Sequence, residues 1–92
     1  MAYHIAICDD SRTDTEYTEA LLKKWAKKRQ AEIRLQTFVS AESFLFNYEE
    51  DKTWDILLLD IEMGQMDGVE MARRVRRRNG TVQIVFITGY SD

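Results

Sequence analysis

Apolar residues along the chain follow two spacings, one typical of buried strands and the other typical of amphipathic helices. Short continuous or alternating apolar runs favour strands, whereas apolar residues three and four positions apart favour helices. Strands are predicted over residues 3–8, 32–38, 54–60 and 81–87. Helices are predicted over residues 12–29, after Ser40, and between Asp67 and the stop signal Asn79-Gly80. In the last of these helices, Val69, Met71, Ala72 and Val75 are expected to face inward.

Polar residues support these boundaries. Ser11, followed three residues later by Asp14, has the spacing of a capping box, and Ser40 is a candidate cap for the second helix. Residues 32–38 alternate between apolar and polar positions, which predicts a half-exposed strand at one edge of a sheet. Residues 54–60 are apolar on both faces, which favours a central strand of a parallel sheet.

The order of these elements indicates the fold class. Strand and helix alternate three times before the last strand, as in an open α/β sheet built from right-handed parallel crossovers. In such sheets, functional groups collect outside the C-terminal ends of the strands, where the strand order reverses. The residues that directly follow each strand are therefore the first candidates for a functional site.

Composition limits the possible classes of protein. The 92 residues, of which 45% are hydrophobic, can form one core and therefore a single domain. A net charge of −3 argues against binding nucleic acid over the whole surface. No apolar stretch approaches the ~20 residues of a membrane span, and the first residues lack the features of a signal peptide, so we expect a cytoplasmic protein. Cys8 lies in an apolar run and is expected to be a small buried side chain.

Acidic residues follow two of the predicted strands. Asp9 and Asp10 come directly after the first strand, and Asp60 ends the third. If these strands are neighbours, the three carboxylates converge and repel one another, and a cation would relieve that repulsion. Oxygen ligands without a nearby histidine or thiol pair suit Mg²⁺. Alternatively, each acidic motif is only a loop at the start of a helix, since acids are common there.

A third motif follows the fourth strand. Thr88 could donate its hydroxyl hydrogen to a phosphoryl oxygen, and Gly89 would let the backbone approach closely. His4 lies at the opposite end of the first strand and is expected to be structural. Trp25 and Trp54 are expected to pack in the core and at the start of a strand.

Together these motifs resemble the receiver domain of two-component response regulators. Asp9-Asp10, Asp60, Met66-Asp67-Gly68 and Thr88-Gly89 match that family's pattern in order and spacing over the whole chain. The resemblance implies a flavodoxin-like, doubly wound parallel sheet, here with four of five strands in the order 2-1-3-4. More specifically, the segments around residues 5–8, 60–63 and 84–92 resemble regulators that carry a LytTR-type DNA-binding domain.

The resemblance also implies a function and a site. Asp60 would accept a phosphoryl group from the histidine of a sensor kinase. Mg²⁺ would be held by Asp10, Asp60 and the backbone carbonyl of Glu62, with Asp9 assisting, and Thr88 would be the switch hydroxyl. The protein would be a signalling domain and not an enzyme, and DNA would be bound only through an output domain outside these residues.

The chain departs from the family pattern after Thr88. The family has a fifth strand that ends in a lysine, yet every lysine here lies before Asp60. We therefore expect a fragment that lacks the fourth helix, the fifth strand and the fifth helix. Its apolar fourth strand would be an edge that invites self-association. The alternative function is a receiver-like interaction or dimerisation module that is not phosphorylated.

Two basic clusters have more than one interpretation. Five arginines crowd the end of the third helix, and a nucleic-acid patch or favourable charges at a helix C-terminus would each explain them. They are Arg73, Arg74, Arg76, Arg77 and Arg78. The basic residues within 23–29 are interpreted as a solvated helix face.

Overall fold

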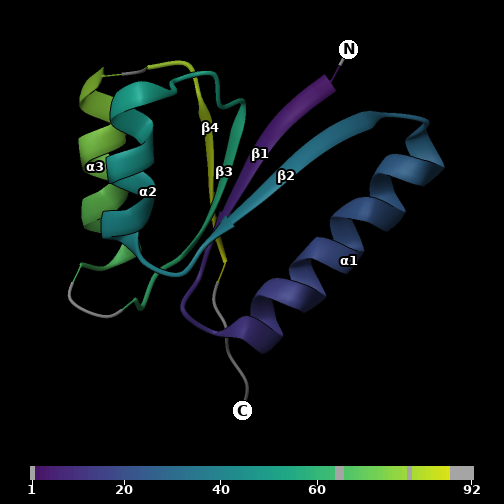
Figure 1. Cartoon of the computed structure of the whole chain (residues 1–92), viewed down its shortest axis with the longest axis horizontal. Coiled ribbons are helices and arrows are strands. Elements are labelled where there is room, and N and C mark those ends of the chain that lie inside the picture. Colours follow the sequence, from purple (N-terminus) through teal and green to yellow (C-terminus); the bar gives the residue numbers. More distant parts are fainter. Residues whose placement is uncertain (1, 64–65, 79, 88–92) are drawn as a thin grey trace.

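A computed structural model describes residues 2–63, 66–78 and 80–87 of the chain. Strands and helices alternate along it, as the sequence predicts (Figure 1). The strands are β1 (Ala2–Cys8), β2 (Glu32–Phe38), β3 (Ile56–Asp60) and β4 (Gln83–Ile87). The helices are α1 (Arg12–Arg29), α2 (Ala41–Glu50) and α3 (Gly68–Arg78).

All strand pairs are parallel, and the sheet has the order β2-β1-β3-β4. This order confirms the predicted doubly wound arrangement within the described residues. Helix α1 covers one face of the sheet, and α2 and α3 lie side by side on the other (Figure 1). In register, Cys8 of β1 pairs with Phe38 of β2 and with Leu59 of β3, so three strands end at the same level.

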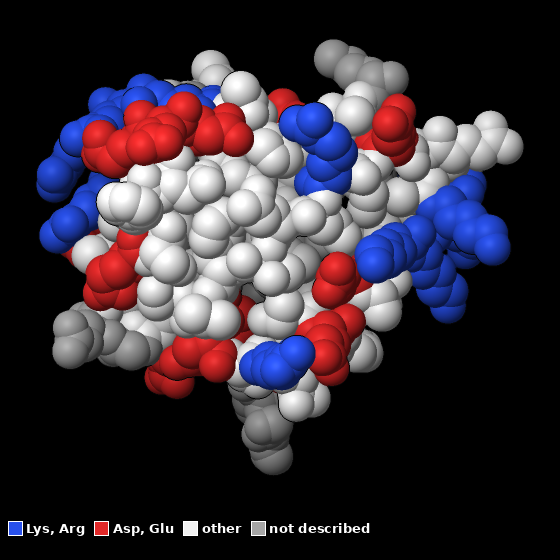
Figure 2. Space-filling model, viewed as in Figure 1, with Lys and Arg blue, Asp and Glu red and all other residues white. Residues whose placement is uncertain are grey.

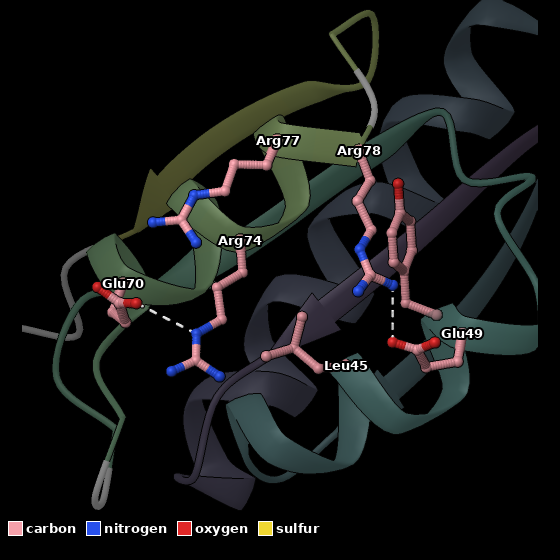
Figure 3. Close-up of a pocket in the computed structure, with 7 residues that line it drawn as sticks. Leu45, Glu49, Glu70, Arg74, Arg77 and Arg78 are labelled. Atoms are coloured by element: carbon pink, nitrogen blue, oxygen red, sulfur yellow. Dashed lines mark hydrogen bonds and ion pairs between the residues drawn. The ribbon is translucent and has the colours of Figure 1, made fainter.

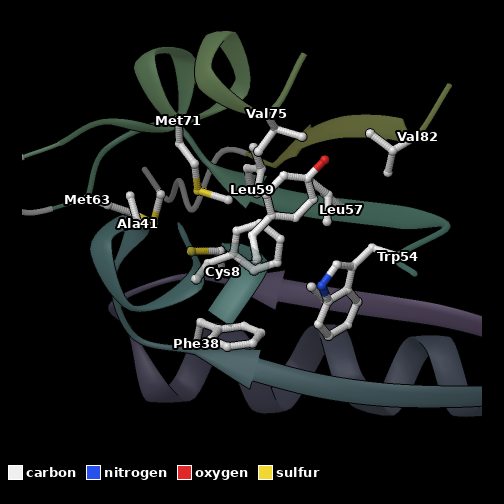
Figure 4. Packing of buried hydrophobic residues seen from close by; sticks show 13 residues of the cluster. Cys8, Phe38, Ala41, Trp54, Leu57, Leu59, Met63, Met71, Val75 and Val82 are labelled. Carbon is white, nitrogen blue, oxygen red and sulfur yellow. The ribbon is translucent and has the colours of Figure 1, made fainter. Parts of the chain in front are cut away.

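The larger hydrophobic cluster fills the space between the sheet and the pair α2 and α3 (Figure 4). Phe44 of α2 is fully buried and meets the ring of Phe38 edge to face, with ring centroids 5.1 Å apart. Trp54 packs against both rings, with centroids 5.9 Å from Phe38 and 5.6 Å from Phe44. From α3, Met71 and Val75 complete this side of the core.

The smaller cluster lies on the α1 face of the sheet. Ile5, Ile7 and Leu58 are its buried members, and Leu22 of α1 packs against them. The apolar residues of β1 and β3 thus serve both faces, which is why these strands lack the alternation seen in β2.

Side chains cap the helices as the sequence predicts. Ser11 Oγ accepts a hydrogen bond from the amide of Asp14 at 3.3 Å, and Ser40 Oγ accepts one from the amide of Ser43 at 3.1 Å. The end of α1 carries no such sequence signal. Gln30 ends it in the left-handed conformation, with φ 55°, where glycine is the usual residue.

His4 is structural, as expected, and belongs to a contact network at the N-terminal edge of the sheet. Its ring stacks on Trp54 with centroids 3.7 Å apart, and its Nδ1 lies 3.0 Å from Thr53 Oγ1. The amide of His4 donates to Asp55 Oδ2 at 2.8 Å, and the amide of Asp55 donates to the carbonyl of His4. Residues 54 and 55 make these contacts before the strand starts, and β3 begins at Ile56 and not at Trp54.

Two packing predictions are wrong. Trp25 is 39% exposed and lies on the surface of α1, where its ring is 6.2 Å from that of Tyr3. Val69 of α3 is 38% exposed, although its spacing suggested an inward position. Among the described residues, none of the helices combines the length and the apolar character that a membrane crossing needs.

Candidate functional site

Three aspartate side chains meet at the C-terminal edge of the sheet, where β1 and β3 end side by side. Cys8 and Leu59 are register partners, so Asp9 and Asp60 are the next residues on two neighbouring strands. One carboxylate oxygen from each of Asp9, Asp10 and Asp60 lies within 4.8 Å of the others. The structure therefore brings together the acids that the sequence predicted would converge.

Backbone contacts position two of these aspartates. The amide of Asp9 donates to the carbonyl of Phe38 at 3.0 Å, which ties the residue to the end of β2. Asp9 Oδ1 accepts a hydrogen bond from the amide of Ser11 at 2.9 Å. Asp60 Oδ1 accepts one from the amide of Glu62 at 3.3 Å. Glu62 therefore adjoins the acids through its backbone, while its side chain is exposed.

The cluster is partly withdrawn from water. Asp9 is 4% exposed and Asp60 is 9% exposed, whereas Asp10 is exposed. Burial raises the pKa of the Asp9 carboxyl above its ordinary value, and the nearby negative charges, that of Asp60 foremost, raise it further. The hydrogen bond from the Ser11 amide lowers this pKa and so offsets part of the effect.

This arrangement favours a hard divalent cation. Two carboxylates about 5 Å apart repel by about 3 kcal/mol at an effective dielectric constant of about 20. The donor atoms of Asp9, Asp10 and Asp60 are all carboxylate oxygens, which Mg²⁺ prefers. Cys8 is adjacent, but burial raises the pKa of its thiol to about 12, and its Sγ donates to the carbonyl of Ser40. The candidate metal-holding group among the described residues therefore consists of the three carboxylates.

The start of α3 packs directly against the backbone of the site. A Cβ atom on Gly68 would overlap the carbonyl oxygen of Asp60 and would lie 3.1 Å from its carbonyl carbon and 3.2 Å from the Cα of Ile61. The amide of Gly68 donates to the carbonyl of Ile61 at 2.8 Å. Asp67 caps the helix by accepting from the amide of Glu70 at 2.8 Å. Residue 68 must therefore be glycine for the helix to begin where it does.

The structure describes some of the remaining predicted site residues and not others. Thr88 and Gly89 lie outside the described residues. Glu62 adjoins Asp60 through its backbone amide, and the ligand function of its carbonyl stays a prediction. Sequence reasoning gave Ser11 only a capping function, yet its amide also holds Asp9. The spacing Asp9-Asp10-Ser11 is the signal that could have identified this contact, because aspartate side chains often accept from the amide two residues on.

Comparison with known proteins identifies one family. The sequence model of the family described as "Response regulator receiver domain" matches residues 5–92. The transcriptional regulatory protein NatR of Bacillus subtilis is 30% identical over 86 residues, which cover 94% of this chain and 35% of NatR. An uncharacterized response regulatory protein of Vibrio cholerae is 36% identical over 78 residues, which cover 80% of this chain and 30% of that protein. The chain thus spans about a third of the length of these relatives.

Solved structures agree with this match. The BeF3-activated receiver domain of DrrB has a TM-score of 0.69 at 29% identity, with 100% of this chain and 70% of that chain covered. The histidine kinase ThkA in complex with the response regulator TrrA gives a TM-score of 0.70 at 28% identity, with coverage of 98% and 72%. A receiver domain from Clostridium thermocellum gives a TM-score of 0.80 at 20% identity, with coverage of 98% and 68%, which supports the fold alone.

The contact beneath Gly68 generates a first prediction. Replacing Gly68 with alanine should lower the free energy of unfolding by about 1–3 kcal/mol, because the new methyl group meets rigid backbone. Urea denaturation followed by circular dichroism measures this change. Gly80→Ala is the matched control, since nothing lies within 4 Å of its Cβ position. Equal stabilities of the two variants would contradict the proposed packing.

The pKa of Asp9 generates a second prediction. A carboxyl whose pKa is raised on folding binds more protons in the folded state, so its contribution to stability falls as pH rises through and above the ordinary carboxyl range. Asp9→Asn should therefore be more stable than the parent at pH 7 in EDTA, by about 1 kcal/mol, and this difference should shrink near pH 3. Thermal unfolding at both pH values measures it.

Asp51 supplies a control of opposite sign. Hydrogen bonds from Thr53 lower the pKa of Asp51, so Asp51→Asn should not stabilise the chain at pH 7. Added Mg²⁺ should raise the unfolding temperature of the parent more than that of Asp9→Asn, because a ligand that binds only the folded state stabilises it. A stabilising effect of Asp9→Asn that persists unchanged at pH 3 would count against electrostatic repulsion at the site.

Proposed function

The chain belongs to the response regulator receiver domain family, and we propose that Asp60 is its phosphoacceptor. Receiver domains are signalling domains of two-component systems and not enzymes. The observation that carries the proposal is the position of Asp60, which ends the central strand β3 within 4.8 Å of two further carboxylates. Its partial burial and the cation that the cluster favours suit the transfer of a highly charged group.

The phosphoryl group would come from a phosphorylated histidine of a sensor kinase. A carboxylate oxygen of Asp60 forms a bond to phosphorus while the bond from phosphorus to the imidazole nitrogen breaks, and that nitrogen keeps the electron pair. The similarity to TrrA, which was solved in complex with the histidine kinase ThkA, supports this type of donor. Transfer from such a kinase would take place in the cytoplasm.

The residues around Asp60 fit the metal that the family uses. Asp9, Asp10 and Asp60 would hold Mg²⁺ through their carboxylates, and Glu62 would do so through its backbone carbonyl. When bound, Mg²⁺ neutralises charge on the transferred phosphoryl oxygens. Asp60 supplies the nucleophilic oxygen, and the amide of Glu62 orients its carboxylate.

Signal output is a further part of the proposal. Thr88 would sense the new phosphoryl oxygens through its hydroxyl, with Gly89 allowing the adjoining backbone to move. NatR is named a transcriptional regulatory protein, and this chain covers 35% of its length. We infer that the protein regulates transcription through a second domain that lies outside these residues. Only that domain would contact DNA.

Phosphorylation by a small donor tests the assignment of Asp60. Phosphoramidate carries a bond from phosphorus to nitrogen, as phosphohistidine does. With Mg²⁺, the chain should gain the mass of one phosphoryl group, and Asp60→Asn should gain none. Mass spectrometry of the intact protein measures both.

Asp67→Asn is the matched control, since Asp67 is an exposed acid near the site whose side chain accepts a hydrogen bond from the amide of Glu70 at the start of α3. This variant should be phosphorylated like the parent, and EDTA should abolish the reaction in both. Phosphorylation that survives Asp60→Asn, or that Asp67→Asn abolishes, would refute the assignment.

A second proposal, for association between copies, rests on a difference between the two sheet edges. The edge strand β2 exposes Glu32, Arg34 and Gln36, and the charges of the first two discourage pairing with another chain. The described residues of β4 carry no charge, and Val85 and Phe86 are 46% and 43% exposed. We propose that β4 pairs with β4 of a second copy.

Sedimentation at increasing concentration tests this pairing. The parent should form dimers, and Val85→Lys should shift the chain toward monomer, because a charge would face its symmetry mate across the strand pair. Gln36→Lys on β2 is the control and should leave the dimer intact. A parent chain that stays monomeric at high concentration would exclude the proposal, and so would a Val85→Lys variant that dimerises as well as the parent.

A further inference from the structure

A cleft lies between α2 and α3 (Figure 3), and none of the three clustered aspartates lines it. It has a volume of about 370 Å³, within the range of small-molecule sites. Tyr48 and Glu49 of α2 and Glu70, Arg74, Arg77 and Arg78 of α3 contribute to its walls. We propose that this cleft binds a small molecule that carries phosphate groups.

Charge in the cleft favours an anion. Three guanidinium groups face two carboxylates, so the walls carry a net positive charge. Arg78 Nη1 pairs with Glu49 Oε2 at 2.7 Å and thereby joins α3 to α2, while Arg74 Nε pairs with Glu70 Oε2 at 3.1 Å. Arg77 forms no ion pair with any residue that the structure describes. Each guanidinium has five N–H donors, so the two paired arginines retain donors for a ligand.

Tyr48 supplies an independent observation. Its side chain is 2% exposed, and its hydroxyl has no hydrogen-bond partner among the described residues. A buried hydroxyl without a partner costs about 1–3 kcal/mol, so such groups usually face a ligand, an ion or a water molecule. Lys52 Nζ also lies 5.5 Å from the centroid of the Tyr48 ring, which adds a further positive charge beside the cleft.

These features select the class of ligand. Arginine forks bind phosphate through paired hydrogen bonds. The hydroxyl of Tyr48 is covered in the ligand-free chain, so it can donate another only after the side chains above it move aside. Because Glu49 and Glu70 already neutralise part of the positive charge, a ligand with two or more negative charges competes with them better than a monoanion. A long nucleic-acid backbone fits less well, since the arginines of α3 adjoin acidic residues and do not form an unbroken basic surface (Figure 2).

Inorganic pyrophosphate is a suitable probe. In EDTA, the aspartate cluster cannot bind it through a metal ion. Titration of the full chain followed by ¹⁵N–¹H correlation spectra should shift the amide signals of residues 45–49 and 74–78, with saturation in the millimolar range. Arg77→Gln should weaken binding about fivefold, as expected for the loss of one charged hydrogen bond.

Tyr48→Phe separates a ligand contact from a purely structural one. It should weaken pyrophosphate binding about fivefold, yet it should raise the unfolding temperature of the ligand-free chain, because it removes a buried hydroxyl that has no partner. Arg12→Gln on α1 is the matched control, since it removes an exposed arginine far from the cleft, and it should bind like the parent.

Three results would overturn the proposal. The first is the absence of saturable shifts in α2 and α3. The second is binding that Arg77→Gln and Tyr48→Phe leave unchanged. The third is an equal loss of affinity in Arg12→Gln, which would show nonspecific attraction to a basic surface.

Discussion

The close approach of three carboxylates at the end of β1 and β3 is the constraint on which the rest of the molecule depends. Parallel pairing brings Asp9 and Asp60 together, because Cys8 and Leu59 are register partners. The resulting repulsion is unfavourable in the chain alone, and it is the property that makes the site attractive to a cation. Stability and the proposed cation binding are therefore opposed at this edge of the sheet, and the packing of the two hydrophobic clusters offsets the repulsion.

Packing on both faces keeps the acids in place. β1 and β3 are central strands, covered by α1 on one side and by α2 and α3 on the other. A shift of either strand by one residue would turn its apolar residues to the opposite face, so the register is well determined. Gly68 adds a second restraint, because it allows α3 to begin against the carbonyl of Asp60. The geometry of the site is thus a consequence of core packing as much as of the acids themselves.

The sequence predicts most of this arrangement because its signals are local. Apolar runs identify β1 and β3, and the aspartates that follow them can be read directly. Trp25 was misplaced because helical spacing identifies a face of α1 without showing how much of that face the sheet covers. Gln30 ends α1 without glycine, which propensity does not predict. The cleft was not predicted, since it depends on how two helices distant in sequence lie against each other.

Helix α3 physically connects the two sites. It begins at Gly68, against the backbone of Asp60, and it ends at Arg78, which pairs with Glu49 of α2. Arg78 is ten positions after Gly68, which corresponds to about 15 Å along a helix. Because a continuous helix moves largely as a rigid body, any displacement of its first turn by a group on Asp60 is carried to the arginines at its other end. The ion pair between Arg78 and Glu49 would then stretch or re-form, so the proposed ligand of the cleft and the proposed phosphorylation of Asp60 would act on the same helix from opposite ends.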